Sequence, residues 1–236
     1  MRLISCSGVI LFLLASLVAV AEQELPFFTD VTESAGLHCK HSYGDVELKN
    51  IVQGTGSGAM FFDFDGDGWL DIYLVCGRWE KDISSNRSRH LRGKLTNKLY
   101  RNNHDGTFTD VTEKAGVAGQ YFACGASAAD YDGDGNIDLL VLGYGHQELY
   151  HNNGDGTFTD VSAKSGLGRE SRWSVAAGWF DYNHDGRLDV YVVNYLKYDP
   201  NFIPPFYAPQ GYPGPLSYPG EPDGLYRNNG DGTFTD

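Results

Sequence analysis

The chain has 236 residues, of which 31 are acidic and 18 are lysine or arginine, and its formal net charge at pH 7 is -13. Such a charge repels nucleic-acid phosphates and anionic lipid at long range, so we expect no nucleic-acid partner. Hydrophobic residues make up 41% of the chain, which is enough for a core, and 30 glycines with 15 tyrosines favour β-strands joined by many turns.

The first residues predict a secretion signal rather than a part of the fold. Arg2 supplies a positive start, residues 9–20 are almost entirely apolar, and small residues lead up to a cleavage site after Ala21. We therefore expect residues 1–21 to be removed and residues 22–236 to be secreted into an extracellular or periplasmic space. No other segment approaches about 20 apolar residues, so we expect no membrane span in the mature chain.

Three cysteines would remain in the mature chain, Cys39, Cys76 and Cys124. Secretion allows one disulfide, and an odd number leaves at least one thiol without a partner in this chain. Their spacing matches no zinc pattern.

Two motifs alternate along the sequence. The first, the carboxylate loop, has the form Asp-x-Asp/Asn-x-Asp-Gly-x-x-Asp and occurs at residues 63–71, 130–138 and 181–189. The second, the polar turn, has the form Asn-Asn-x-Asp-Gly-Thr-Phe-Thr-Asp and occurs at residues 102–110, 152–160 and 228–236. The step from polar turn to carboxylate loop is nearly constant, at 28 residues from Asn102 to Asp130 and 29 from Asn152 to Asp181. A period of about 50 residues predicts a repeat architecture.

Each repeat predicts four short antiparallel strands, one pair around the carboxylate loop and one pair around the polar turn. The expected fold class is all-β, a β-propeller of four-stranded blades at about residues 58–112, 122–162 and 174–236. Residues 27–32 match the outer strand at the end of a blade, as expected for a strand that closes a ring. Three blades fall short of the usual four, so we expect a partial ring, the N-terminal fragment of a longer one.

The carboxylate loops predict about three calcium sites. Positions 1, 3, 5 and 9 offer side-chain oxygens, position 7 offers a backbone carbonyl, and glycine at position 6 allows the sharp turn. Two carboxylates about 5 Å apart repel by roughly 3 kcal/mol at an effective dielectric near 20, a cost that a cation relieves. The candidate ligands of the first loop are Asp63, Asp65, Asp67, the Trp69 backbone and Asp71. Those of the second are Asp130, Asp132, Asp134, the Asn136 backbone and Asp138. Those of the third are Asp181, Asn183, Asp185, the Arg187 backbone and Asp189.

The third loop has Asn183 where the other two have aspartate, so we expect it to bind calcium most weakly. Magnesium prefers a rigid octahedron with several waters and fits the pattern less well. For the polar turns, side-chain caps explain the residues without any metal.

Two insertions lengthen the middle connection of their blades, at roughly residues 78–96 and 196–220. We expect both on the face opposite the carboxylate loops. The first is basic, with Arg87, Arg89, His90, Arg92 and Lys94. The second is aromatic, with Tyr198, Phe202, Phe206, Tyr207, Tyr212 and Tyr218. Such loops suit glycan or peptide contact, and the alternative is that they pack on the propeller surface. Asn86 starts a glycosylation acceptor sequence if the host is eukaryotic.

The two alternating motifs resemble FG-GAP and VCBS-type propeller repeats, including those of integrin α-subunits. The element Leu-Tyr-Arg-Asn-Asn-Gly-Asp-Gly-Thr-Phe-Thr-Asp at residues 225–236 is most similar to the cartilage acidic protein family, in which an ASPIC/UnbV domain follows the propeller. The resemblance covers residues 27–236 and implies an extracellular, calcium-stabilised propeller used in adhesion or matrix interaction. The given sequence holds no ASPIC/UnbV segment.

Two functions fit these observations. The first is a secreted calcium-binding repeat protein, an interaction or adhesion module whose partner is an extracellular protein or glycan. The alternative is a carbohydrate-active enzyme that uses the propeller as scaffold, which a buried pair of acidic side chains away from the carboxylate loops would favour. No nucleophile elbow, phosphate loop or zinc-protease helix occurs, so we expect a non-enzymatic protein and name no catalytic residue.

Overall fold

A computed structural model of the chain describes residues 28–39, 41–167, 171–201 and 212–236. The chain divides into two units, Met1–Val31 and Thr32–Asp236. The predicted signal at residues 1–21 lies outside the described residues. The outer strand expected at residues 27–32 is not observed, because residues 28–31 belong to no strand and residue 27 is not described. Its sequence matches the fourth strand of a blade, and the described residues contain no first three strands that it could join.

The unit Thr32–Asp236 contains three four-stranded antiparallel sheets, each formed by consecutive strands. The first sheet comprises β1 (Gly58–Phe62), β2 (Asp71–Val75), β3 (Lys98–Asn102) and β4 (Phe108–Asp110). The second comprises β5 (Ala123–Ala129), β6 (Asp138–Gly143), β7 (Gln147–Asn152) and β8 (Phe158–Asp160). The third comprises β9 (Ser174–Phe180), β10 (Asp189–Asn194), β11 (Gly224–Asn228) and β12 (Phe234–Thr235). The predicted fold class is confirmed: the protein is all-β, with propeller-like four-stranded sheets.

Short helices precede the first strand of this unit and lie in the connections between later strands. They are α1 (Ile51–Gly54), η1 (Asn86–Leu91), α2 (Thr112–Ala115), α3 (Ser162–Ser165) and η2 (Pro215–Ser217). None of the helices that the structure describes has the length and apolar character needed to cross a membrane.

The second sheet is packed between the other two, and strand β6 shows why. All of its residues are buried, and alternate side chains serve opposite faces. Leu139 and Val141 join the core with the first sheet, whereas Leu140 and Leu142 join the core with the third. Their partners include Tyr73 and Leu99 in the first sheet and Val190 and Val192 in the third. Successive sheets therefore stabilise one another face to face, as blades do.

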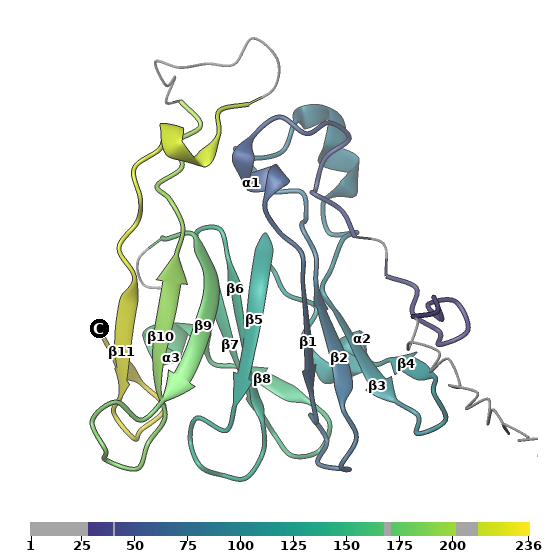
Figure 1. The fold of residues 1–236 in the computed structure, drawn as a ribbon, viewed down its shortest axis with the longest axis vertical. Helices are drawn as coiled ribbons and strands as arrows, with labels where there is room; N and C mark the ends of the chain where they lie inside the picture. Colours follow the sequence, from purple (N-terminus) through teal and green to yellow (C-terminus); the bar gives the residue numbers. More distant parts are fainter. Residues whose placement is uncertain (1–27, 40, 168–170, 202–211) are drawn as a thin grey trace, which may run out of the picture. The chain divides into compact units, whose positions relative to one another are not determined.

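The two ends of these sheets differ in character (Figure 1). The connections β1–β2, β5–β6 and β9–β10, which are the carboxylate loops, lie together at the lower end of the view. Helices α1, η1 and η2 lie at the upper end, so the described parts of the two insertions are opposite the carboxylate loops, as predicted.

A third core cluster, which includes Val52, Phe122 and Trp173, lies at the end with the insertions. Tyr198, Tyr212 and Tyr218 of the aromatic insertion pack against it, which matches the surface-packing alternative for these three. Phe202, Phe206 and Tyr207 lie outside the described residues.

Candidate metal centres

Each carboxylate loop is the hairpin connection between the first two strands of its sheet. In the first sheet, Phe62 pairs with Asp71, so the strands separate at this pair and enclose residues 63–70. The other loops open at equivalent pairs, Ala129 with Asp138 and Phe180 with Asp189. At position 6 of the motif, Gly68 has φ 87° and Gly135 has φ 93°, a conformation that disfavours any residue with a Cβ.

The aspartate at position 1 folds the loop around itself. Asp63 accepts hydrogen bonds from the backbone N–H of Asp67 at 3.1 Å and of Gly68 at 2.8 Å. Asp130 accepts the equivalent bonds from Asp134 and Gly135, and Asp181 accepts them from Asp185 and Gly186. The carboxylate at position 1 therefore lies at the centre of the loop, and the loop backbone turns around it.

The aspartate at position 9 is buried and accepts hydrogen bonds from both the carboxylate loop and the polar turn of its sheet. One oxygen of Asp71 accepts the backbone N–H of Phe64 at 3.1 Å, and the other accepts the N–H of Asn102, in the polar turn, at 2.8 Å. Asp138 is bound in the same way by Tyr131 and Asn152, and Asp189 by Tyr182 and Asn228. Burial raises the pKa of Asp71 and of Asp138 to about 6. We predicted these residues as metal ligands and missed their structural role, for which the regular alternation of carboxylate loop and polar turn was the available signal.

Side-chain oxygens converge in the first two loops. Asp63, Asp65 and Asp71 each place a carboxylate oxygen within 4.8 Å of the others, and so do Asp130, Asp132 and Asp138. In the first loop, Oδ1 of Asp65 is buried and has no hydrogen-bond partner. A buried anionic oxygen without a partner is costly, and a hard cation would satisfy it. The first two loops therefore bring together enough carboxylate oxygens to hold a metal ion.

The remaining predicted ligands have local roles. The position 5 side chains each accept the backbone N–H of position 7, in the pairs Asp67–Trp69, Asp134–Asn136 and Asp185–Arg187. In the third loop, Oδ1 of Asn183 accepts the N–H of Asp185, and its amide donates to the Asp185 carboxylate at 3.0 Å. Among the described residues, the third loop does not bring three carboxylates within 4.8 Å, which agrees with the presence of an amide there. The backbone carbonyls of Trp69, Asn136 and Arg187 stay a prediction as ligands.

Cationic side chains approach the same carboxylates, and no motif in the sequence predicted them. Arg101, on strand β3, donates from Nε to Asp65 at 2.5 Å and from Nη2 to Asp67 at 2.9 Å, and His104 lies 2.8 Å from Asp67. In the third loop, Arg187 donates to Asp185 at 2.5 Å. These bonds compensate the crowded negative charge, and a metal ion would have to replace them.

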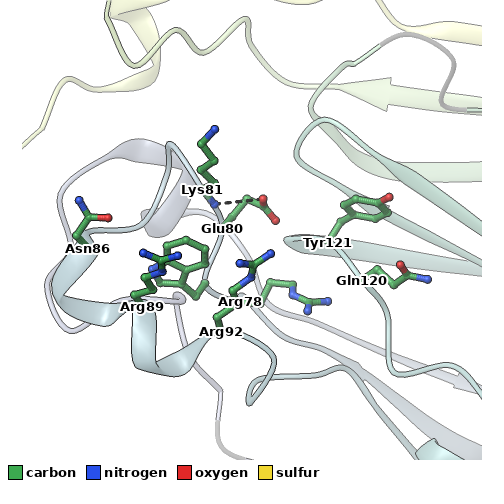
Figure 2. A pocket seen from close by; sticks show the side chains of 9 residues that line it. Arg78, Glu80, Lys81, Asn86, Arg89, Arg92, Gln120 and Tyr121 are labelled. Atoms are coloured by element: carbon green, nitrogen blue, oxygen red, sulfur yellow. Dashed lines mark hydrogen bonds between the residues drawn. The ribbon is translucent and has the colours of Figure 1, made fainter.

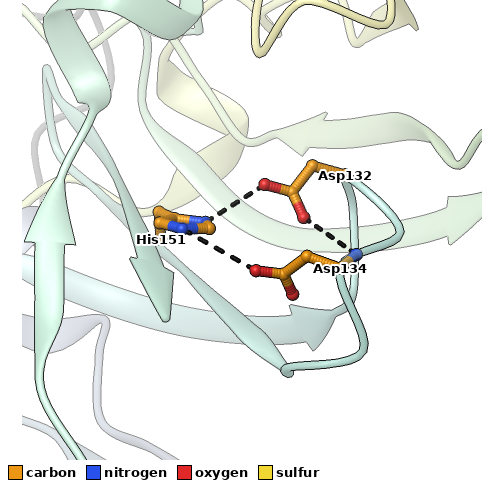
Figure 3. A group of neighbouring side chains, drawn as sticks. All are labelled: Asp132, Asp134 and His151. Atoms are coloured by element: carbon orange, nitrogen blue, oxygen red, sulfur yellow. Dashed lines mark hydrogen bonds and ion pairs between the residues drawn. The ribbon is translucent and has the colours of Figure 1, made fainter. Parts of the chain in front are cut away.

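The second loop meets a histidine instead (Figure 3). His151 occupies the place on β7 that Arg101 occupies on β3, one residue before the first asparagine of the polar turn. Its Nδ1 lies 3.1 Å from Asp132, and its Nε2 lies 3.8 Å from Asp134. A guanidinium offers five N–H donors in a rigid fork, whereas an imidazole offers at most two, so the second loop faces the weaker competitor.

The polar turns are closed by side-chain caps, as predicted. Asp105 accepts the backbone N–H of Thr107 at 2.9 Å and its hydroxyl at 2.6 Å, and Asp155 and Asp231 repeat both bonds. The turns also connect neighbouring sheets, because the Asn152 amide donates to the carbonyl of Phe64 at 2.7 Å and the Asn228 amide donates to that of Tyr131 at 2.7 Å. Each carboxylate loop of the first two sheets is thereby tied to the next sheet.

Comparison with known proteins agrees with the repeat assignment. The family described as FG-GAP-like repeat matches residues 63–141 and 130–192, which together exceed half of the chain. No curated protein matches the sequence. Among solved structures, a lectin from Agrocybe aegerita, described as recognising non-reducing terminal N-acetylglucosamine, is similar at 22% identity and a TM-score of 0.36. The match covers 74% of this chain and 36% of that lectin, so this chain spans about a third of the lectin's length.

Proposed function

Because the chain belongs to the FG-GAP-like repeat family, we propose that it is a calcium-stabilised, propeller-like module that binds an extracellular protein or glycan. The observation that carries the metal part is the first carboxylate loop, where three aspartates converge and the Asp65 oxygen is buried without a partner. The equivalent convergence in the second loop supports it.

The proposed ligands are the side chains at positions 1, 3, 5 and 9 and the carbonyl at position 7 of each loop. Calcium supplies positive charge and a flexible shell of six to eight oxygens, so it would let the crowded carboxylates approach without repulsion. Asp71, Asp138 and Asp189 would join the metal to the polar turns, because their oxygens already hold backbone N–H groups there. Metal binding would then stabilise the sheets and not only the loops.

The proposed location is extracellular or periplasmic. It is supported by the charged, apolar and small-residue order of residues 1–21. The finer assignment to the cartilage acidic protein family is supported by the Leu-Tyr-Arg-Asn-Asn element that leads into the third polar turn.

An enzymatic role finds less support in the described residues. Outside the carboxylate loops, the buried acidic side chains are Asp45 and Glu148. Asp45 accepts bonds from Ser85, Ser88 and Gln53, and Glu148 accepts the backbone N–H of Gln120. The two carboxylates are engaged by different groups, which favours structural roles over an acid–base pair.

Thermal unfolding in millimolar calcium, in millimolar magnesium and in chelator tests the metal proposal. We expect the melting temperature to be highest in calcium, since an ion at 100 times its dissociation constant adds about 2.7 kcal/mol per site. Asp65→Asn and Asp132→Asn should lose much of the calcium response. Asp155→Asn removes the same charge from a polar turn and is the matched control, which should keep the response. Equal melting temperatures in calcium and chelator would overturn the proposal.

A further inference from the structure

A basic hollow lies at the end of the sheets that carries the insertions (Figure 2). Its volume is about 430 Å³. Arg78, Arg89 and Arg92 come from the first insertion and line one side, and Gln120 and Tyr121, from the segment before β5, line the other. The hollow therefore spans the boundary between the first and the second sheet, far along the sheets from the carboxylate loops.

The cations of this hollow are unpaired in an otherwise acidic chain. The hollow is lined by Arg78, Lys81, Arg89 and Arg92 but by one carboxylate, Glu80. No ion pair joins any of these four cations to a carboxylate among the described residues.

Several basic side chains elsewhere in the chain pair with carboxylates. The carboxylate-bound cations include Lys49, Arg87, Lys98, Arg101 and Arg187. Four cations gathered beside one lining carboxylate, and without an ion pair to it, in a protein of net charge -13 indicate a place for an external anion.

The protein holds two of the four cations in place. Arg78 donates to the carbonyl of Gly119 at 2.8 Å, and the guanidinium of Arg92 lies over the ring of Trp79 at 5.8 Å. Trp79 is itself buried and donates from Nε1 to the carbonyl of Ser85 at 3.0 Å. Because these two guanidinium groups are already positioned, less entropy is lost when an anion binds.

The buried carboxylate of Asp45 anchors the insertion beneath the hollow. It accepts bonds from the Ser85 backbone and hydroxyl and from the Ser88 hydroxyl, and these bonds lower the pKa of Asp45. On the opposite side, the ring of Tyr121 stacks on that of His146 with centroids 3.6 Å apart. Both sides of the hollow are thus fixed by contacts that do not involve a ligand.

The residues of the hollow select the ligand class. Guanidinium groups bind sulfate and carboxylate through two parallel hydrogen bonds, and several separated cations suit several anionic groups. Tyr121 offers an aromatic surface for a sugar ring, while Asn86 and Gln120 offer amides for hydroxyl groups. The volume suits a small-molecule or oligosaccharide segment rather than a lone ion.

We propose that this hollow binds an oligosaccharide that carries sulfate or carboxylate groups. The proposal rests on the proposed role in extracellular binding and specifies its partner, but it does not need calcium in the carboxylate loops. A short anionic sugar carries fewer charges than a long nucleic acid, so this acidic chain repels it less at long range.

Calorimetric titration of the full mature chain with a heparin-derived hexasaccharide, its desulfated form and inorganic sulfate tests this. We expect the sulfated hexasaccharide to bind, with an affinity that falls steeply as salt rises, and the desulfated form to bind at least tenfold more weakly. The double variant Arg89→Ala/Arg92→Ala should reduce affinity at least tenfold. Arg87→Ala is the matched control, because Arg87 lies on the same helix η1 and pairs with Glu47 outside the hollow.

Each other outcome counts against the inference. If Arg87→Ala weakens binding as much as the double variant, general charge and not the hollow is responsible. If inorganic sulfate binds as tightly as the hexasaccharide, the hollow takes a free anion and the oligosaccharide is wrong.

Melting curves of the same variants in calcium and chelator verify folding and separate the two proposals. A calcium-responsive protein that binds none of the three probes refutes this inference alone. A protein that binds the hexasaccharide without any calcium response refutes the metal part of the proposed function alone.

Discussion

Replacing Arg101 by alanine tests whether the first carboxylate loop exchanges a protein cation for a metal ion. The guanidinium bonds Asp65 at 2.5 Å and Asp67 at 2.9 Å, and its side chain is 43% exposed. Exposed ion pairs contribute about 0.2–1 kcal/mol each, so the two contacts together contribute about 0.4–2 kcal/mol. Calcium must replace these contacts. We therefore expect Arg101→Ala to tighten calcium binding at the first loop by about two- to thirtyfold and to lower the melting temperature in chelator.

The first loop contains its own reporter for this experiment. Trp69 is 48% exposed and stacks on His104 with ring centroids 4.8 Å apart, so its fluorescence should change when His104 leaves Asp67. Arg227→Ala is the matched control, since Arg227 holds the equivalent place on β11 and forms no ion pair with the third loop among the described residues. Unchanged or weaker calcium binding in Arg101→Ala would refute the competition.

The remaining predictions concern single residues. Asn183→Asp should tighten calcium binding at the third loop, on the order of tenfold, in a titration with a local probe, and weaker binding would contradict the charge argument. Asn152→Ala should cost about 1–3 kcal/mol in calcium and in chelator alike, measured by denaturant unfolding, because this fully buried amide bonds two carbonyls. Burial raises the pKa of Glu148, so stability falls as pH rises through that pKa; Glu148→Gln should raise the melting temperature at neutral pH and have a smaller effect near about pH 4. Burial and the neighbouring Cys76 raise the pKa of the Cys39 thiol, so the two thiols lie near each other; mild oxidation should join them in a disulfide, detected by peptide mass analysis, and should stabilise the fold by about 4 kcal/mol.

The strand order could be predicted from the sequence because local signals determine it. The alternation of apolar and polar residues on either side of each motif locates the hairpins. The repeat of about 50 residues shows where one sheet ends and the next begins. Strand β6 is the instructive case, since its run from Leu139 to Leu142 is apolar on both faces, as expected for a strand with a sheet on each side. The strand expected at residues 27–32 is not observed. A strand motif indicates an extended segment but does not show which other strand it can pair with.

The motif spacing located the carboxylate loops correctly, but several side chains that contact the loop aspartates come from distant parts of the sequence. Asp71 is held by Asn102, 31 positions away, and the charges of Asp65 and Asp67 meet Arg101 on the same distant strand. No local pattern reveals such contacts. Similarly, the sequence shows the run of basic residues but not what each of them contacts. In the structure Arg87 pairs with Glu47, whereas Arg89 and Arg92 line the hollow.

The loops and the core form one connected structure, which gives the metal proposal a consequence beyond local binding. Asp71 bonds the backbone N–H of Phe64, and the carbonyl of the same residue accepts the amide of Asn152 from the next sheet. The Phe64 side chain is buried in the core between these two sheets. An ion that fixes the first loop would therefore also fix the position of a core residue and a link between sheets. Calcium should then raise the cooperativity of unfolding across neighbouring sheets, because each loop stabilises the boundary that follows it.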